Sequence, residues 1–140
     1  MSPVETVDAY FVCLDTENWS RMRTLWCTDC ELRAVGARPR SGLDEVIGYF
    51  SRLFTPWSRH RDLPTRLIRD CDTIVAEVAF TGTTPDGRQV SFDAIDVFDL
   101  QSGRIRTLSN WYDLAYVRRV LDDPPDSPTR PEPLSGGNAR

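Results

Sequence analysis

Apolar residues at helical spacing mark the start of the chain. Val4, Val7, Phe11 and Leu14 recur every three or four positions. The segment SPVE just before this stripe has the form of a capping box, with Ser2 as the N-cap and proline in the first turn. The pattern therefore predicts a helix from residue 3 onward.

Two more helices and a short strand are predicted before residue 55. The segment 17–26 carries tryptophan, methionine and leucine at helical spacing. The segment 41–54, SGLDEVIGYFSRLF, offers Ser41 as an N-cap with Asp44 three residues later, followed by an apolar helical face. Between them, CELRAV at 30–35 has the composition of a strand.

The second half of the chain shows the alternation of apolar and polar residues that is typical of strands. Segments 65–71, 73–84, 88–100 and 104–114 alternate apolar with polar residues and are rich in β-branched and aromatic side chains. The sequences PDGR and QSGR between the later segments are typical of hairpin turns. LAYVRRVL, at 114–121, then predicts a short closing helix.

Helices followed by an antiparallel run of strands indicate an α+β fold. We expect a cone-shaped, curved antiparallel sheet wrapped around the N-terminal helices and enclosing a pocket. A chain of 140 residues is long enough for one core and too short for two, so residues 1–121 form a single predicted domain. Residues 122–140 are rich in proline and nearly free of apolar side chains, which predicts a disordered tail.

The composition is that of a globular protein without affinity for polyanions. Hydrophobic residues make up 40%, charged residues 27%, and the formal net charge is -4, which argues against a nucleic-acid surface. No apolar run approaches a membrane span, and MSPVETVDAY has acids where a signal peptide needs a basic and then an apolar segment. We therefore expect a cytoplasmic protein that binds hydrophobic small molecules, with no nucleic acid and no membrane as partner.

The cysteines and the single histidine do not predict a metal site. Four cysteines include one CxxC, at Cys27 and Cys30, but a closed zinc site needs four ligands and His60 is the only histidine. We expect reduced thiols, no metal and no cofactor. His60 stands among arginines in WSRHRDL, which predicts an exposed loop.

One acidic residue conflicts with the alternation. In SFDAIDVFDL the side chains of Phe92, Ala94 and Phe98 share one face of a strand, and the same parity places Asp96 on that face. An unpaired carboxylate there costs several kcal/mol or stays protonated. Because acids on apolar faces often mark functional sites, Asp96 is the leading candidate for chemistry.

Three segments make the chain resemble the nuclear transport factor two-like superfamily, which includes ketosteroid isomerases, limonene epoxide hydrolases and SnoaL-like polyketide cyclases. Segment 8–26 is similar to its first two helices, VGARPRSG at 35–42 to the connection before its third helix, and AIDVFDLQSGRI at 94–105 to its penultimate strand and turn. In the ketosteroid isomerases a protonated aspartate and a tyrosine donate hydrogen bonds to a substrate oxyanion. The resemblance implies these roles for Asp96 and Tyr10.

Other positions depart from the family patterns. The general base of the isomerases falls on Arg33, whose guanidinium cannot abstract a proton near neutral pH. If Arg33 faces Asp96, its charge favours the ionised acid, which then acts as a base or an acceptor. The water-activating aspartate of the epoxide hydrolases falls on Asn110, which orients water without deprotonating it, and Glu77 offers an alternative carboxylate. A scytalone-dehydratase-like site relies on histidines, and this chain has His60 alone.

These features predict a cofactor-free isomerase, cyclase or lyase of natural-product metabolism. Its substrate is a hydrophobic, polyketide- or terpenoid-like molecule, converted by acid/base cyclisation, isomerisation or dehydration. The predicted catalytic residues are Asp96, Tyr10, Arg33 and Asn110. The residues expected to line the pocket are Trp26, Phe50, Phe54, Phe92, Leu108 and Tyr112. The alternative is a non-catalytic ligand-binding or dimerisation module of the same fold.

The outer face of the predicted sheet suggests self-association. Alternation places Ile95 and Val97 opposite Asp96, away from the core. We therefore expect a homodimer formed through this face, as the resemblance also implies.

Overall fold

The computed structural model describes residues 1–122 as an α+β fold of four helices and six strands. The elements are, in order, α1 (Pro3–Thr16), α2 (Trp19–Thr24), β1 (Trp26–Ala34), β2 (Arg40–Ser41), α3 (Leu43–Leu53), β3 (Arg59–Asp70), β4 (Thr73–Thr83), β5 (Gln89–Gln101), β6 (Arg104–Tyr112) and α4 (Leu114–Asp122). The predicted tail at 122–140 lies, apart from its first residue, outside the described residues. No helix within residues 1–122 combines the length and the apolarity needed to cross a membrane.

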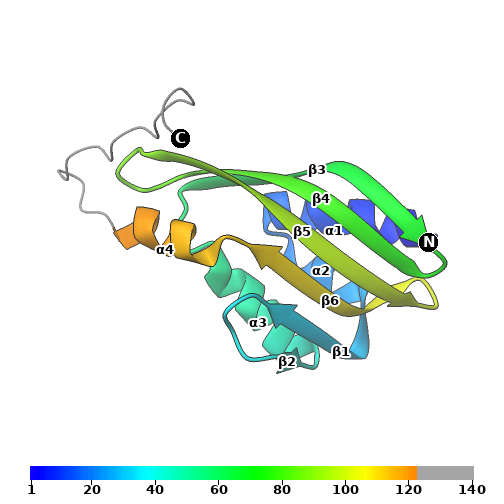
Figure 1. Ribbon diagram of the computed structural model, residues 1–140. Helices are drawn as coiled ribbons and strands as arrows, with labels where there is room; N and C mark the ends of the chain where they lie inside the picture. The colour runs from blue at the N-terminus through cyan, green and yellow to red at the C-terminus, as the bar shows by residue number, and fades with distance from the viewer. Residues whose placement is uncertain (123–140) are drawn as a thin grey trace.

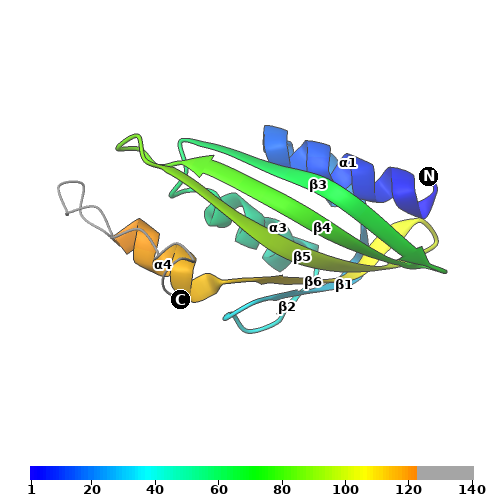
Figure 2. The same cartoon turned by 45° about the horizontal axis from the view of Figure 1, so that its top comes forward.

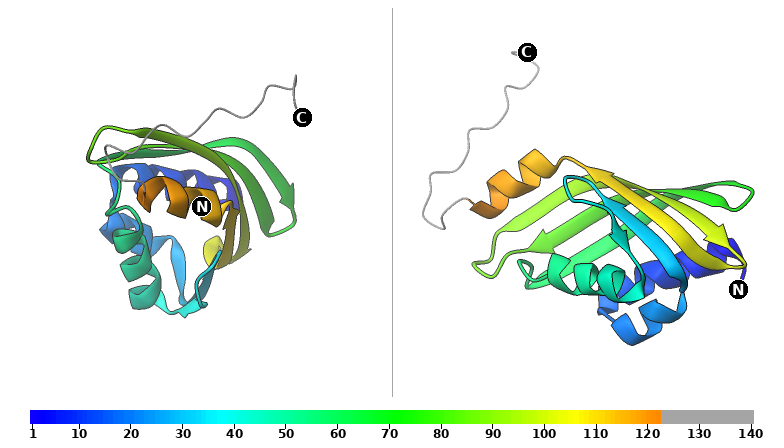
Figure 3. Two further views of the ribbon diagram at one scale, coloured as in Figure 1. Left: turned by 60° about the vertical axis from the view of Figure 1, so that its left-hand side comes forward. Right: turned by 90° about the horizontal axis from the view of Figure 1, so that it is seen from below.

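All six strands form one curved sheet in the order β2-β1-β6-β5-β4-β3. The predicted antiparallel meander from β3 to β6 is confirmed. The pair β1 and β6 is parallel, which corrects the expectation of a purely antiparallel sheet. The strands wrap around α1, α2 and α3, which lie on one side of the sheet, while α4 follows the end of β6 (Figures 1, 2 and 3).

The first helix begins as the sequence predicts. The Glu5 backbone N–H donates to Ser2 Oγ (3.2 Å), and the Ser2 N–H donates to Glu5 Oε1 (2.8 Å), which closes the capping box. These two bonds satisfy N–H groups that have no partner inside the helix, and so they fix where α1 starts.

The third helix begins one residue later than predicted. Its N-cap is Gly42, at a φ of 87°, and no side chain caps it. Ser41 instead belongs to the short strand β2, where it pairs with Glu31 of β1, and the Gly42 N–H donates to the carbonyl of Cys30 (2.9 Å). The backbone pairing with β1 thus overrides the serine as a cap.

Two other boundaries differ from the prediction. The second helix ends at Thr24, so that Trp26 is the first residue of β1 and not part of a helix. Strand β3 starts at Arg59, well before the predicted residue 65, and includes His60. The predicted loop around His60 is therefore wrong, because this segment pairs with the end of β4, where His60 lies opposite Gly82.

The core lies between the helices and the concave face of the sheet. The inward side chains of β5 include Ala94, Asp96 and Phe98, as the alternation predicts. Phe98 is fully buried and makes edge contacts with Tyr10 and Phe11 of α1. This packing ties α1 to the sheet directly beneath the position of Asp96.

Candidate acid–base site

An apolar pocket of about 290 Å³ opens on the concave face of the sheet. Strands β1, β3, β4, β5 and β6, together with α1, α3 and α4, contribute to its wall. Aromatic and aliphatic side chains form most of the lining, among which the acids are Asp62 from β3 and Asp96 from β5. Two carboxylic acids in an apolar cavity are unusual unless they serve binding or chemistry.

Asp96 is held in place by its neighbours on the sheet. Only 3% of the residue is exposed, and it lies between Ala76 of β4 and Asn110 of β6. The Asn110 Nδ2 donates to Asp96 Oδ1 over 2.6 Å. Burial raises the pKa of Asp96 to about 6, although the hydrogen bond from Asn110 favours the ionised form.

Asp62 is a second buried acid that the sequence did not reveal as a site residue. It lies on β3 opposite Phe80, and its backbone N–H donates to Asp15 Oδ1 of α1 (2.9 Å). Burial, followed by the negative charges of Asp96 and Asp15, raises the pKa of Asp62 to about 8. At neutral pH this carboxyl is therefore mainly protonated.

Tyr10 brings a hydroxyl to the same pocket. Burial raises the pKa of Tyr10 well above its usual range, and the charges of Asp96 and Asp62 add to the effect. The hydroxyl therefore remains a neutral hydrogen-bond donor at every physiological pH. Its ring is fixed by edge contacts with Phe50 (5.9 Å) and Phe98 (5.0 Å).

Three of the four predicted catalytic residues meet in this pocket, and Arg33 does not. Tyr10, Asp96 and Asn110 belong to its lining. Arg33 lies between Leu32 and Ala34, both buried toward the pocket, so that its own side chain points away. It is 63% exposed and pairs with Glu31 (3.3 Å) on the outer side. Arg33 therefore does not face Asp96, because the strand parity is opposite to the one assumed.

Most of the predicted wall residues line the pocket. The five that do so are Phe50, Phe54, Phe92, Leu108 and Tyr112. Trp26 is the exception, since it is buried behind the lining against Tyr10 and Phe50, with ring centroids 6.3 and 5.9 Å away. The early end of α2 places Trp26 at the start of β1, next to Ile105 and below the cavity.

The alternative carboxylate Glu77 is also outside the pocket. Arg66 binds it with two hydrogen bonds of 3.0 Å, from Nε and from Nη2. Glu77 pairs with Ile95, whose side chain is on the opposite face of β5 from Asp96. Glu77 therefore cannot supply the second acid of the site, and Asp62 takes that place.

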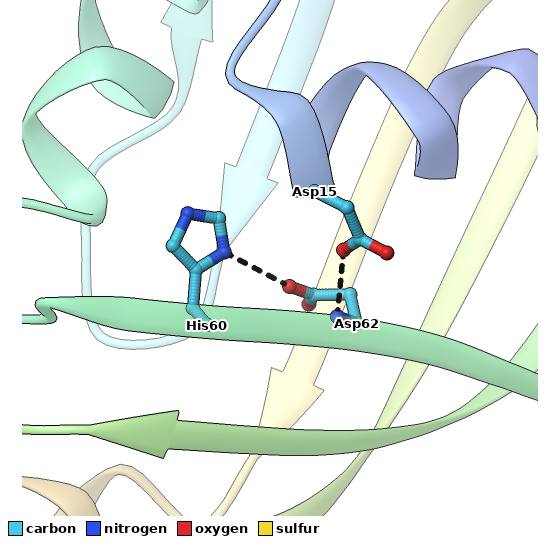
Figure 4. A group of neighbouring side chains, drawn as sticks. All are labelled: Asp15, His60 and Asp62. Atoms are coloured by element: carbon cyan, nitrogen blue, oxygen red, sulfur yellow. Dashed lines mark hydrogen bonds and ion pairs between the residues drawn. The ribbon is translucent and has the colours of Figure 1, made fainter.

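His60 is buried and not exposed as predicted. Only 4% of its side chain is accessible, and its ring stacks on Phe54 with centroids 3.9 Å apart. Strand alternation turns His60 and Asp62 inward (Figure 4), whereas Arg59 and Arg61 occupy the exposed positions of the same strand. In RHRD all four positions are polar, so the sequence does not show which face of the strand is buried.

A small group of side chains beside the pocket has the composition of a metal site. Asp15, His60 and Asp62 each offer one ligand atom, all within 4.8 Å of one another (Figure 4). Asp15 Oδ1 already accepts the Asp62 N–H, and neither Cys27 nor Cys30 belongs to the group. Three donors, one of them already bonded, fall short of the four ligands of a closed zinc site.

Comparison with known proteins is consistent with this architecture. Residues 7–108 match the family model of the SnoaL-like domain. No curated protein matches the chain significantly. Among solved structures, an NTF2-like protein of unknown function from Burkholderia pseudomallei superposes with a TM-score of 0.81 at 20% identity, covering 88% of this chain and 100% of that one.

Two further structures share the fold. A candidate SnoaL-like polyketide cyclase from Jannaschia has a TM-score of 0.80 at 20% identity, covering 87% of this chain and 92% of that one. TerC, co-crystallized with polyporic acid, has a TM-score of 0.78 at 12% identity, covering 86% of this chain and 98% of that one. Such low identities establish the fold alone, whereas the family model spans most of the described residues. The chain therefore belongs to the SnoaL-like domain family.

Proposed function

We propose that this protein is a cofactor-free acid–base enzyme that cyclises, isomerises or dehydrates a hydrophobic small molecule. The observation that carries the proposal is the presence of Asp62 and Asp96 in one apolar pocket with different raised pKa values. Carboxyl groups whose environments separate their pKa values are suited to act as acid and base together. An apolar scaffold alone needs neither of them.

The two acids differ in ionisation at neutral pH. With a pKa of about 6, Asp96 is mainly a carboxylate, and Asn110 fixes one of its oxygens. With a pKa of about 8, Asp62 mainly keeps its proton. We assign Asp96 as the base that removes a proton from carbon, Asp62 as the acid that serves an oxygen, and Tyr10 as a neutral donor to that oxygen.

The cavity favours a compact, largely apolar substrate. Its volume of about 290 Å³ and its aromatic wall of Phe50, Phe54 and Phe92 suit a polyketide- or terpenoid-like molecule of a few rings. The co-crystallization of TerC, which has the same fold, with polyporic acid supports a ligand of this kind.

Exchange of α-protons tests the proposal without the natural substrate. The probe is 2-tetralone, an apolar cyclic ketone fused to a benzene ring, in D2O, and the loss of its α-proton signals is followed by NMR. We expect the wild-type protein to accelerate exchange with a bell-shaped pH profile whose limbs lie at about 6 and about 8. The Asp96→Asn variant is expected to lose about a hundredfold of this rate.

The control is Asp93→Asn, an exposed acid on the same strand, which should exchange the probe at the wild-type rate. If 2-tetralone binds but the wild type and Asp96→Asn exchange it equally, the pocket does not act as a base. That outcome supports the alternative of a non-catalytic ligand-binding module.

A further inference from the structure

Glu17, His60 and Asp62 form a line of side chains from the surface to the pocket. Glu17 is the C-cap of α1, half-exposed, and its Oε2 lies 2.9 Å from His60 Nε2. On the other side of the ring, His60 Nδ1 lies 4.0 Å from Asp62 Oδ1 (Figure 4). Asp62 in turn borders the cavity.

The two inner atoms of this line have no other partner. His60 Nδ1 and Asp62 Oδ1 are both buried and make no hydrogen bond among the described residues. An ionised Glu17 carboxylate has no proton to donate, so it must accept a hydrogen bond from Nε2–H. In a neutral imidazole ring the other nitrogen, Nδ1, then carries no hydrogen and is an acceptor without a donor. A single proton between Nδ1 and Oδ1 would satisfy both atoms at once, since buried polar groups are nearly always paired.

The groups around Asp62 make an anionic neighbourhood. Asp15 faces it from α1 and Asp96 faces it from β5, while Tyr10 of α1 is neutral and Arg118 of α4 lines the same pocket. Among the ion pairs of residues 1–122, His60 supplies the one basic group within 4.0 Å of Asp62. His60 is thus placed to take the proton whenever Asp62 ionises.

The imidazole ring of His60 is fixed in an orientation that turns Nδ1 toward Asp62. Stacking on Phe54 at 3.9 Å and the bond to Glu17 leave the ring little freedom to turn. The Asp62 carboxyl, at 4.0 Å, needs a shift of about 1 Å to reach Nδ1 directly. A small rotation of one side chain therefore makes the bond.

We infer that His60 and Asp62 share one proton, and that His60 is a positioning residue that returns this proton to Asp62 before Asp62 acts as the acid in the pocket. In the transfer, the O–H bond of Asp62 breaks and an N–H bond forms at Nδ1, with no oxidation and no other reactant. Nε2–H stays bonded to Glu17 throughout. The pair keeps its net charge, so that Asp62 can release and recover a proton within the buried site. The catalytic part of this inference rests on the proposed function.

The single histidine makes the test direct. In 15N- and 13C-labelled protein without a histidine tag, every imidazole signal belongs to His60. We expect the imidazole nitrogen shifts to show two steps, the upper one coinciding with the titration of the Asp62 carboxyl carbon at about pH 8, and the Nε2–H bonded to Glu17 to persist through this upper step. A single imidazole step that does not coincide with the Asp62 carboxyl overturns the inference.

Variants separate coupling from structure. Asp62→Asn is expected to abolish the upper imidazole step, whereas Asp70→Asn, an exposed acid at the end of the same strand, leaves both steps in place. Persistence of the upper step in Asp62→Asn contradicts the shared proton. If Asp62→Asn does not fold, the test is whether the upper imidazole step and the Asp62 carboxyl carbon of the wild-type protein have the same midpoint.

This test needs no substrate, so its outcome is independent of the proposed function. If the protein does not exchange 2-tetralone but both imidazole steps are present, the proposed function is refuted and the shared proton is not.

Discussion

At the residue scale, the buried acids reduce the stability of the fold. Asp96 has one hydrogen bond, from Asn110, and the Asp62 carboxyl Oδ1 has none among the described residues. Removing a carboxylate from water without full compensation costs several kcal/mol. Side chains kept at such a cost are more readily explained by function than by packing.

The Asp96→Asn variant should be stable but inactive. The amide keeps an oxygen that accepts from Asn110 Nδ2 and removes a buried negative charge, so we expect the free energy of unfolding at pH 8 to rise by about 1–3 kcal/mol. Because Arg33 is exposed and pairs with Glu31, the change leaves no guanidinium unpaired. Denaturant melts at pH 8 measure the effect, and a loss of stability that Arg33→Met reverses would contradict the structure.

Stability should fall as pH rises from about 4 to about 8. The pKa values of Asp96 and Asp62 are raised from an ordinary 3.8 to about 6 and about 8. In this window the folded state binds more protons than the unfolded state, so the free energy of unfolding decreases as pH rises. The raised pKa of Asp96 contributes to this decrease up to about pH 6, and the raised pKa of Asp62 contributes up to about pH 8. Urea melts at pH 5 and pH 8 should show a smaller difference in Asp62→Asn than in wild type. An equal difference in both proteins would mean that Asp62 ionises normally.

The sequence revealed one acid and concealed the other for a physical reason. Asp96 stands in a long, regular strand, where alternation alone places it inward. Asp62 stands in a strand that contains Pro64 and a register shift just after it, and arginines dominate its polar face. Proline argues against a strand from the sequence alone, although it is tolerated at an edge, and β3 is one of the two edge strands.

At the element scale, the position of α4 depends on one glycine. Gly36, in the turn after β1, has a φ of 75°, and a Cβ there would collide with Leu114 at the start of α4. Leu114, Val117 and Leu121 of α4 all line the pocket. The turn after β1 therefore packs directly against a side chain of the helix that covers the cavity.

Gly36→Ala should displace α4 and open the pocket. We expect a loss of about 1–3 kcal/mol of stability and stronger binding of an apolar fluorescent dye. Gly87→Ala is the matched control, because its φ of 91° imposes the same backbone strain while nothing lies within 4 Å of its Cβ. Equal effects of the two variants would show that α4 is not held by this contact.

The sequence predicts which segments are helices and which are strands better than it predicts which strands pair and in what register. The capping box at Ser2 and the alternation of β4 and β5 depend on local chemistry, and both are confirmed. The parallel pairing of β1 with β6 and the outward side of Arg33 depend on register between segments far apart in the chain. Register of a single strand can shift by one residue without changing its composition, and such a shift reverses every side chain.

At the scale of the whole molecule, the outer face of the sheet carries exposed apolar side chains. The most exposed is Trp111, at 51%, and the others are Leu63, Ile68 and Ile95. Apolar residues gathered on the open face of a sheet are typical of an interface between proteins. We expect a second copy of this chain to cover them.

Trp111→Lys should therefore convert a homodimer to a monomer. A charge at the centre of an apolar interface is costly to bury, so sedimentation at micromolar concentration should show half the mass of the wild type. Val12→Lys is the control, because Val12 is equally exposed but lies on α1. A wild-type protein that already sediments as a monomer at this concentration would contradict the prediction.

The parallel pair of β1 and β6 determines when the site can come into existence during protein synthesis. β1 leaves the ribosome early, yet apart from the two-residue β2 its partner is the last strand within residues 1–122 to be made. Residues 35–103, more than half of the described chain, must be closed as a loop before these strands meet, and such contacts form late and slowly. The cavity, which has β1 on one wall and β6 on the next, is therefore absent from every shorter nascent chain, and folding and the ability to bind a ligand arise in the same final step.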